Sequence, residues 1–196
     1  MTDLYLPSGS GPALSGHDRH VLDLLGREGA IEVSFQGLRR LLDIHQESLT
    51  RALRRLQEEG LVSGTREGYR LSSQGVSLAR AGRDPIQSPP IPVLRTVLPG
   101  EHEGRRATEA LRQRWFGPLR WFGFAEDAAG RTLTWTTEDG GIRLDARFEG
   151  IFLSIDGRLV DPNRLPEAVE AAHRILNEVT RAYMDAGASA LPGPDS

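Results

Sequence analysis

Arginine supplies the most distinctive chemistry of this sequence, because all 24 basic residues are arginines and lysine is absent. The net charge is -3 at pH 7, so the chain as a whole is not basic. Residues 36–70 nevertheless carry a local excess, with seven arginines against five acidic residues. The guanidinium group stays charged and forms forked hydrogen bonds with phosphates. Any contact with nucleic acid must therefore come from this local patch.

The residues needed for most catalytic and metal sites are missing or scattered. The chain has no cysteine, which excludes disulfides, thiolate metal ligands and thiol catalysis, and the absence of lysine excludes lysine-based chemistry. No glycine-rich phosphate loop, nucleophile elbow or HExxH motif occurs. His17 and His20 share a helix face and His102 lies between two glutamates, but surface or capping histidines are the default interpretation. We expect no enzymatic activity, no metal site and no cofactor.

Length and composition indicate a globular protein of one large or two small domains. The chain has 196 residues, of which 38% are hydrophobic and 26% charged. No apolar run approaches the roughly 20 residues of a membrane helix, and the start of the chain lacks the pattern of a signal peptide. We therefore expect a cytoplasmic protein without a membrane partner.

A proline-rich stretch divides the chain. Residues 82–92 read GRDPIQSPPIP, which cannot continue a helix and favours an extended spacer. Both ends of the chain are rich in Gly, Ser and Pro and show no periodicity. The predicted organisation is a disordered tail, a first domain, a linker, a second domain and a second disordered tail, at residues 1–14, 15–82, 83–92, 93–186 and 187–196.

Helical periodicity dominates the residues ahead of the linker. Ser15, followed three positions later by Asp18, predicts a capping box for a first helix that stops near Gly29. Ser34 is the expected N-cap of a second, short helix. The apolar residues that this second helix is expected to bury are Phe35, Leu38, Leu41 and Leu42.

A third helix and a hairpin are expected next. The helix should run from about Gln46 to Glu59 and end at Gly60 in a left-handed conformation. Two short strands, 61–63 and 69–72, flank a glycine-bounded turn, and a fourth helix follows at 73–81. The predicted buried stripe of the third helix is Leu49, Ala52, Leu53 and Leu56.

Residues 45–75 read HQESLTRALRRLQEEGLVSGTREGYRLSSQG. This string, with its order of three helices and a hairpin, resembles the winged helix-turn-helix domain of MarR-like transcriptional regulators from bacteria and archaea, over residues 15–82. The family usually has glycine in the turn and Ser or Thr as N-cap, where this chain has Asp43 and His45. Aspartate tolerates such a turn, whereas histidine is a poorer cap. The resemblance implies a sequence-specific DNA-binding transcriptional regulator that binds double-stranded DNA as a homodimer.

The resemblance also implies a set of DNA contacts, because the third helix would enter the major groove with its outward face. Residues near its start would meet base edges, and residues further along would meet phosphates. The expected base-proximal residues are Gln46, Ser48, Thr50 and Arg51. The expected phosphate or minor-groove contacts are Arg54, Arg55, Arg66 and Arg70.

Two alternatives to DNA contact stay open. The arginines could instead form i,i+4 ion pairs on a solvated helix face, namely Glu47–Arg51, Arg54–Glu58 and Arg55–Glu59. Some winged helices bind only protein, so the chain could be a protein-interaction module without specific DNA binding.

Strand patterns dominate the second half. A short apolar run at 93–98 and a helix at 105–116 precede four strand-like runs, at 119–125, 132–137, 142–148 and 151–155. A long helix at about 164–186 carries an apolar stripe for the dry face of the sheet or for a coiled-coil dimer contact. The predicted order is β-α-β-β-β-β-α, and the whole chain is therefore α+β. In element order this half resembles the TBP-like or helix-grip arrangement, whose members often hold an apolar ligand.

Aromatic residues are concentrated in this second half, which holds all three tryptophans and five of the six phenylalanines. The default interpretation is a hydrophobic core. The functional interpretation is a pocket for a small apolar or planar effector, with an arginine at its polar end. The candidate ligand-binding residues are Trp121, Trp135, Phe148 and Arg143. The second half is thus expected to sense a ligand or to mediate dimerisation.

Overall fold

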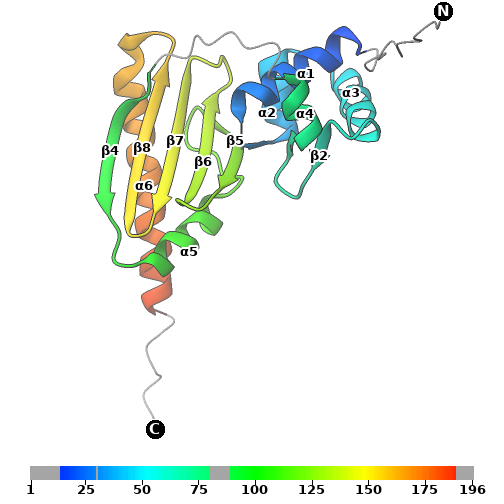
Figure 1. The fold of residues 1–196 in the computed structure, drawn as a ribbon. Coiled ribbons are helices and arrows are strands. Elements are labelled where there is room, and N and C mark those ends of the chain that lie inside the picture. The colour runs from blue at the N-terminus through cyan, green and yellow to red at the C-terminus, as the bar shows by residue number, and fades with distance from the viewer. Residues whose placement is uncertain (1–13, 30, 80–88, 189–196) are drawn as a thin grey trace, which may run out of the picture.

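The molecule is α+β, with antiparallel strands and a long C-terminal helix (Figure 1). The computed structural model describes residues 14–29, 31–79 and 89–188. Its helices are α1 (Gly16–Glu28), α2 (Phe35–Leu42), α3 (Gln46–Glu58), α4 (Ser73–Ala79), α5 (Glu101–Leu111) and α6 (Leu165–Ala188). Its strands are β1 (Glu32–Val33), β2 (Val62–Gly64), β3 (Tyr69–Leu71), β4 (Ile91–Val97), β5 (Leu119–Glu126), β6 (Arg131–Thr137), β7 (Ile142–Glu149) and β8 (Phe152–Leu159).

Local sequence signals account for the ends of the first helices. The capping box before α1 is confirmed, because the Asp18 carboxylate accepts a hydrogen bond from the Ser15 amide at 2.9 Å and the Ser15 hydroxyl accepts one from the Asp18 amide at 3.3 Å. The Ser34 hydroxyl accepts a hydrogen bond from the amide of Gly37 at 3.0 Å. Asp43 adopts a left-handed conformation with φ 49°, and His45 precedes α3 without a capping side-chain hydrogen bond. Both departures from the usual turn are therefore accommodated as the sequence predicts.

All eight strands of the described residues form one antiparallel sheet, in the order β2-β3-β1-β5-β6-β7-β8-β4. The two-residue strand β1 joins the two halves of the chain, because it pairs with β3 on one edge and with β5 on the other. Glu32 lies opposite Phe124 and Val33 opposite Gly123, and the amide of Ser34 donates a 2.7 Å hydrogen bond to the carbonyl of Phe122. A strand of two residues has too short an alternation to be recognised in the sequence.

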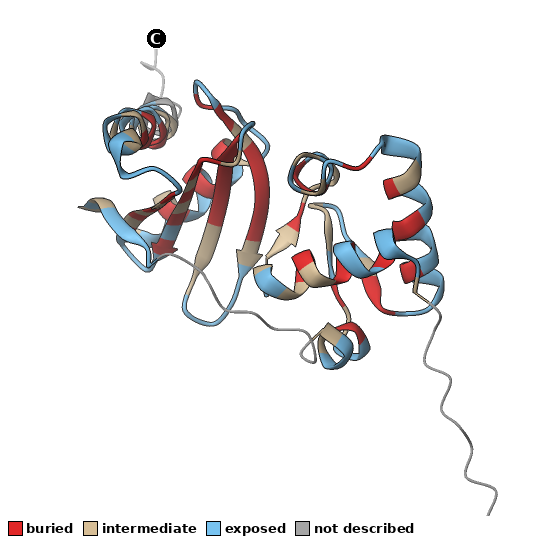
Figure 2. Ribbon diagram, turned by 90° about the horizontal axis from the view of Figure 1, so that it is seen from above, coloured by how far each residue is buried: buried red, intermediate tan, exposed pale blue. Residues whose placement is uncertain are grey.

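Two hydrophobic cores lie on the two sides of this junction (Figure 2). The first is mainly aliphatic and gathers leucines and valines of α1, α2, α3 and the hairpin, together with one fully buried phenylalanine, Phe122, from β5; Phe35 of α2 is partly buried against it. The second lies between the larger part of the sheet and helices α5 and α6, and it contains Trp121, Trp135 and Phe148. The apolar stripe of α6 thus packs on the sheet, as one of the two expectations had it.

The element boundaries correct parts of the predicted organisation. Leu14, assigned to the N-terminal tail, packs against the first core, and α6 continues to Ala188. Ile91 and Pro92, assigned to the linker, begin β4. Pro89 and Pro90 of the predicted linker are exposed and outside any helix or strand, and the remaining tail and linker residues lie outside the described ranges. The predicted helix at 105–116 is α5 at Glu101–Leu111. The last strand, predicted at 151–155, is β8 at Phe152–Leu159, which starts one residue later and ends four residues later.

Candidate nucleic-acid interface

Helix α3 presents a polar face opposite its buried stripe. Leu49, Ala52, Leu53 and Leu56 are buried, as predicted. Gln46, Thr50 and Arg51 are exposed, and Ser48 is half-buried. The Thr50 hydroxyl donates a 2.9 Å hydrogen bond to the carbonyl of Gln46. The four expected base-proximal residues thus lie on the first turns of one helix.

Two arginines of α3 remain accessible to an external partner. Arg51 has no ion-pair partner among the described residues, and the alternative Glu47–Arg51 pair does not form there. Arg54 donates a 2.9 Å hydrogen bond to Glu58, as the i,i+4 alternative predicted, with 80% of the arginine side chain exposed. Exposed pairs of this kind contribute roughly 0–1 kcal/mol, so a phosphate can replace Glu58 at little cost.

Arg55 has a different, internal partner. Its Nη2 lies 2.6 Å from Oδ1 of Asp18 and 3.2 Å from the Ser15 hydroxyl, while its Nε lies 3.3 Å from Oδ2 of Asp18. Asp18 is 3% exposed. Burial alone would raise the pKa of Asp18, but hydrogen bonds from Arg55 and Ser15 outweigh it and hold the pKa below its usual value. In place of the alternative Arg55–Glu59 pair, Arg55 therefore makes a contact that fixes α1 on α3.

The turn between β2 and β3 contacts the second half of the molecule. Arg66 is exposed, but its neighbour Glu67 has a side chain only 9% exposed and forms a 3.1 Å ion pair with Arg112. The guanidinium carbon of Arg112 lies 3.9 Å from the ring centroid of Phe124 in β5. The hairpin turn that carries Arg66 is thus held by a contact with the end of α5.

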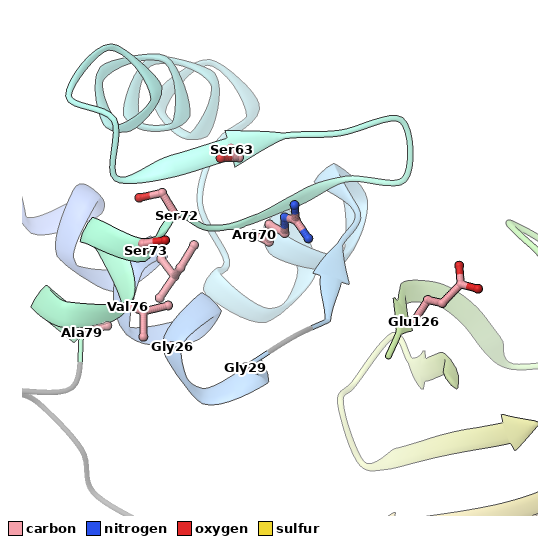
Figure 3. Close-up of a pocket in the computed structure, with 10 residues that line it drawn as sticks. Gly26, Gly29, Ser63, Arg70, Ser72, Ser73, Val76, Ala79 and Glu126 are labelled. Carbon is pink, nitrogen blue, oxygen red and sulfur yellow. The ribbon is translucent and has the colours of Figure 1, made fainter. Parts of the chain in front are cut away.

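Arg70 lies on another surface from α3. Its Nη1 is 3.6 Å from Glu32, and its side chain lines a depression between the hairpin, α1 and α4 (Figure 3). Glu126 of β5 lies across this depression. The other residues that line it are Gly26, Gly29, Ser63, Leu71, Ser72, Ser73, Val76 and Ala79. The structure therefore brings the α3 residues together and separates Arg70 from them.

A second depression adjoins the start of α3 and includes residues that the sequence did not single out. Arg39 is exposed, while Arg40 donates a 2.7 Å hydrogen bond to the carbonyl of Trp121, and its burial lowers its pKa. Glu138, from the turn after β6, lines the same depression as Gln46. The local arginine excess at 36–70 was the signal for Arg39 and Arg40, whereas only the fold brings Glu138 to this place.

The predicted ligand-binding residues do not converge on one site. The rings of Trp121 and Trp135 pack edge to face with centroids 5.7 Å apart, and Phe148 belongs to the same buried core. Arg143 lies on the opposite face of the sheet, because it alternates with the buried Leu144 along β7. There it forms ion pairs with Glu28 at 2.5 Å and with Asp145 at 3.0 Å.

The packing around these residues also opposes a pocket. Four depressions on the described surface are each lined by other residues than Trp121, Trp135 and Phe148. The indole nitrogen of Trp135 is already satisfied by the carbonyl of Arg114, at 2.9 Å. Of the four expected effector-site residues, three therefore belong to a packed core and the fourth bridges β7 to α1.

None of the described helices has a stretch long and apolar enough to cross a membrane. Within the described ranges, no three His, Asp or Glu side chains are grouped closely enough to hold a metal ion. Comparison of the chain with protein-family models, with curated proteins and with solved structures finds no match.

Proposed function

We propose that this chain is a sequence-specific DNA-binding transcriptional regulator of the winged helix-turn-helix type, with α3 as its recognition helix and the β2–β3 hairpin as its wing. The observation that carries the proposal is the polar face of α3. Gln46, Thr50 and Arg51 are exposed there, and Arg51 has no ion-pair partner in the described part of the chain.

The chemistry of this face suits the major groove. Glutamine can pair with adenine and arginine with guanine through two hydrogen bonds each, and residues at the start of a recognition helix are those that reach base edges. Arg54, whose exposed pair with Glu58 is easily exchanged, suits a phosphate contact. Arg39 and Arg66 add exposed positive charge on neighbouring elements.

Two of the expected arginines are left out of the proposed set of DNA-contacting residues because they face partners within the chain. Arg55 is committed to the buried carboxylate of Asp18, and Arg70 faces the depression beside Glu126. The proposed DNA-contacting residues are therefore Gln46, Ser48, Thr50, Arg51, Arg54 and Arg66. With so few phosphate contacts per chain, we propose that a homodimer binds a two-fold site, which doubles the electrostatic attraction.

A protein-interaction module is the second candidate function. It is favoured by the balanced charge of the first half, since residues 1–84 carry 11 arginines and 11 acidic residues, and by the ion pairs that Arg54, Arg55 and Arg70 already form. For the second half we propose dimerisation or partner docking ahead of effector binding, since its aromatic residues are interlocked.

The test is selection of DNA from a random duplex pool, followed by affinity measurements on the selected site. Arg51→Ala should weaken the specific complex by about 1 to 3 kcal/mol, or about 5- to 150-fold, because a base-directed pair is lost. Arg54→Ala should weaken all sequences alike and lower the salt slope by about one ion.

Arg105→Ala is the matched control, because Arg105 is an exposed arginine on α5, away from α3. It should bind as the wild-type chain does. A wild-type chain that enriches no sequence, together with unchanged non-specific binding in Arg51→Ala, would reject DNA recognition and favour the protein-interaction module.

A further inference from the structure

Trp115 differs from the other two tryptophans because 66% of it is exposed. It lies in the segment between α5 and β5, which is held in place on both sides. Phe116 is buried and exchanges two backbone hydrogen bonds with Leu119, at 3.0 and 3.1 Å. The carbonyl of Arg114 accepts the hydrogen bond from Trp135. Tryptophan and arginine are among the residues most enriched at the energetically dominant positions of interfaces.

Arginines surround this ring. The guanidinium carbon of Arg120 lies 4.5 Å from the ring centroid of Trp115, and its Nη1 donates a 2.7 Å hydrogen bond to the carbonyl of Gly117. A shallow depression beside Trp115 is lined by Arg114, Arg174 and Arg181. We call Arg114, Trp115, Arg120, Arg174 and Arg181 the arginine–tryptophan strip.

The charges of the strip are only partly neutralised. Glu178 forms ion pairs with both Arg114 and Arg181, and Glu170 lies 2.6 Å from Arg174. Half or more of the side chains of Arg174 and Arg181 is exposed. Exposed ion pairs are weak, so phosphate oxygens can compete with these carboxylates for the guanidinium groups.

The strip is continuous with the start of α3. Glu138 lines the depression that contains Gln46 and Arg39, and it also forms a 2.9 Å ion pair with Arg120. Arg120 in turn lies on Trp115. A single surface therefore leads from the recognition helix to the strip, and Arg120 balances the negative charge of Glu138 along the way.

We propose that the arginine–tryptophan strip is a second DNA-contacting surface, which binds the backbone of the duplex flanking the site read by α3. This inference rests on the proposed function of α3. The arginines contact phosphates, and the indole of Trp115 packs against the sugar–phosphate backbone. The second half of the molecule thus lengthens the binding site instead of sensing a small molecule.

The experiment compares two duplexes that contain the selected site, one ending close to it and one extended by about one helical turn, roughly 10 base pairs, on each side. The wild-type chain should bind the long duplex more tightly. In the double variant Arg174→Ala/Arg181→Ala this gain should disappear and the salt slope on the long duplex should fall by about two ions, with unchanged affinity for the short duplex. Trp115→Ala should reduce the gain without changing the slope.

Arg105→Ala/Arg106→Ala provides the control, since both residues are exposed arginines of α5 outside the strip. Failure of the wild-type chain to bind either duplex would reject the proposed function together with this inference. If wild-type binding depends on Arg51 but the flanks add nothing, or add equally in the strip variant, only the strip proposal is overturned. A strip variant that changes the dimer mass in light scattering but keeps the flank effect would likewise overturn it and identify a protein interface.

Discussion

The two halves of the molecule complete their cores in different ways. The second core, between the sheet and helices α5 and α6, consists of residues of the second half alone. The first core includes Phe122, which β5 of the second half supplies and which is fully buried. Gly37 of α2 leaves the space for this ring, because a Cβ there would lie 2.9 Å from Phe122 Cδ2. The dependence of the cores is therefore one-sided: the first core contains a side chain of the second half, whereas the second core contains none of the first.

The largest expected effect comes from removing this shared side chain. Phe122→Ala should destabilise the first half by about 3 to 5 kcal/mol, because it deletes a buried phenyl ring and leaves a cavity. Far-UV circular dichroism should show early loss of helix in urea. Tryptophan fluorescence, which reports only on the second half, should change later.

Phe148→Ala is the comparison variant, since Phe148 is buried in the second core. It should shift the circular dichroism and fluorescence transitions together, because the first half cannot stay folded once the second half has unfolded. Coincident transitions in Phe122→Ala would contradict the one-sided dependence.

The next effect concerns the backbone junction between β1 and β5. A Cβ at Gly123 would lie 2.5 Å from the carbonyl oxygen of Glu32 and 2.7 Å from Ile31 Cγ2. Gly123→Ala should cost about 1 to 3 kcal/mol, as overpacking does, and speed hydrogen exchange of the Ser34 amide. Gly16→Ala, where nothing lies within 4 Å of the added Cβ, should leave both unchanged. Slow exchange at Ser34 in Gly123→Ala would show that the junction tolerates a side chain.

Alanine substitutions of the adjacent residues Arg54 and Arg55 in α3 should differ in their effect on the stability of the first half. Arg55→Ala should lower the melting temperature, because it leaves the buried carboxylate of Asp18 without its charged partner. Arg54→Ala should change stability by less than about 0.5 kcal/mol, as an exposed substitution does. Differential scanning calorimetry of both variants tests this. Equal melting temperatures would show that Asp18 does not need Arg55, which could then contact DNA.

The smallest expected effect is on acid stability. A hydrogen bond from Thr137, with others from Gly141 and Arg164, lowers the pKa of Asp139 to about 2. Because this pKa is below that of the unfolded chain, the stabilisation is present at neutral pH and is lost as pH falls from about 4 to about 2. The pKa of Asp18 is lowered too, so its contribution to stability is likewise lost as the pH falls. In Asp139→Asn the free energy of unfolding, measured in urea, should change less between pH 5 and pH 2 than in the wild-type chain. The same pH dependence in both proteins would contradict this prediction.

The sequence predicted the parts of the fold that depend on local rules. Ser15, Ser34 and Gly60 marked helix ends through capping and a left-handed backbone, and the alternation in β7 identified its buried face. It could not predict the β1–β5 pairing, because that strand has two residues and its partner lies about ninety residues away. The contact of Arg55 with Asp18 could not be predicted for a similar reason, since the spacing of Arg55 from Glu59 is visible in the sequence but its distance from Asp18 is not.

The position of Phe122 also bears on whether the two halves of this chain can be exchanged separately by recombination. The proline-rich segment between α4 and β4 is where the sequence looks most permissive to recombination. An exchange at that point would give the first half a new neighbour without a phenyl ring for its leucines and without a strand for the outer edge of β1. Such hybrids would be removed by misfolding, so the two halves should be transmitted as one unit, and a natural relative that carries one of them should carry the other.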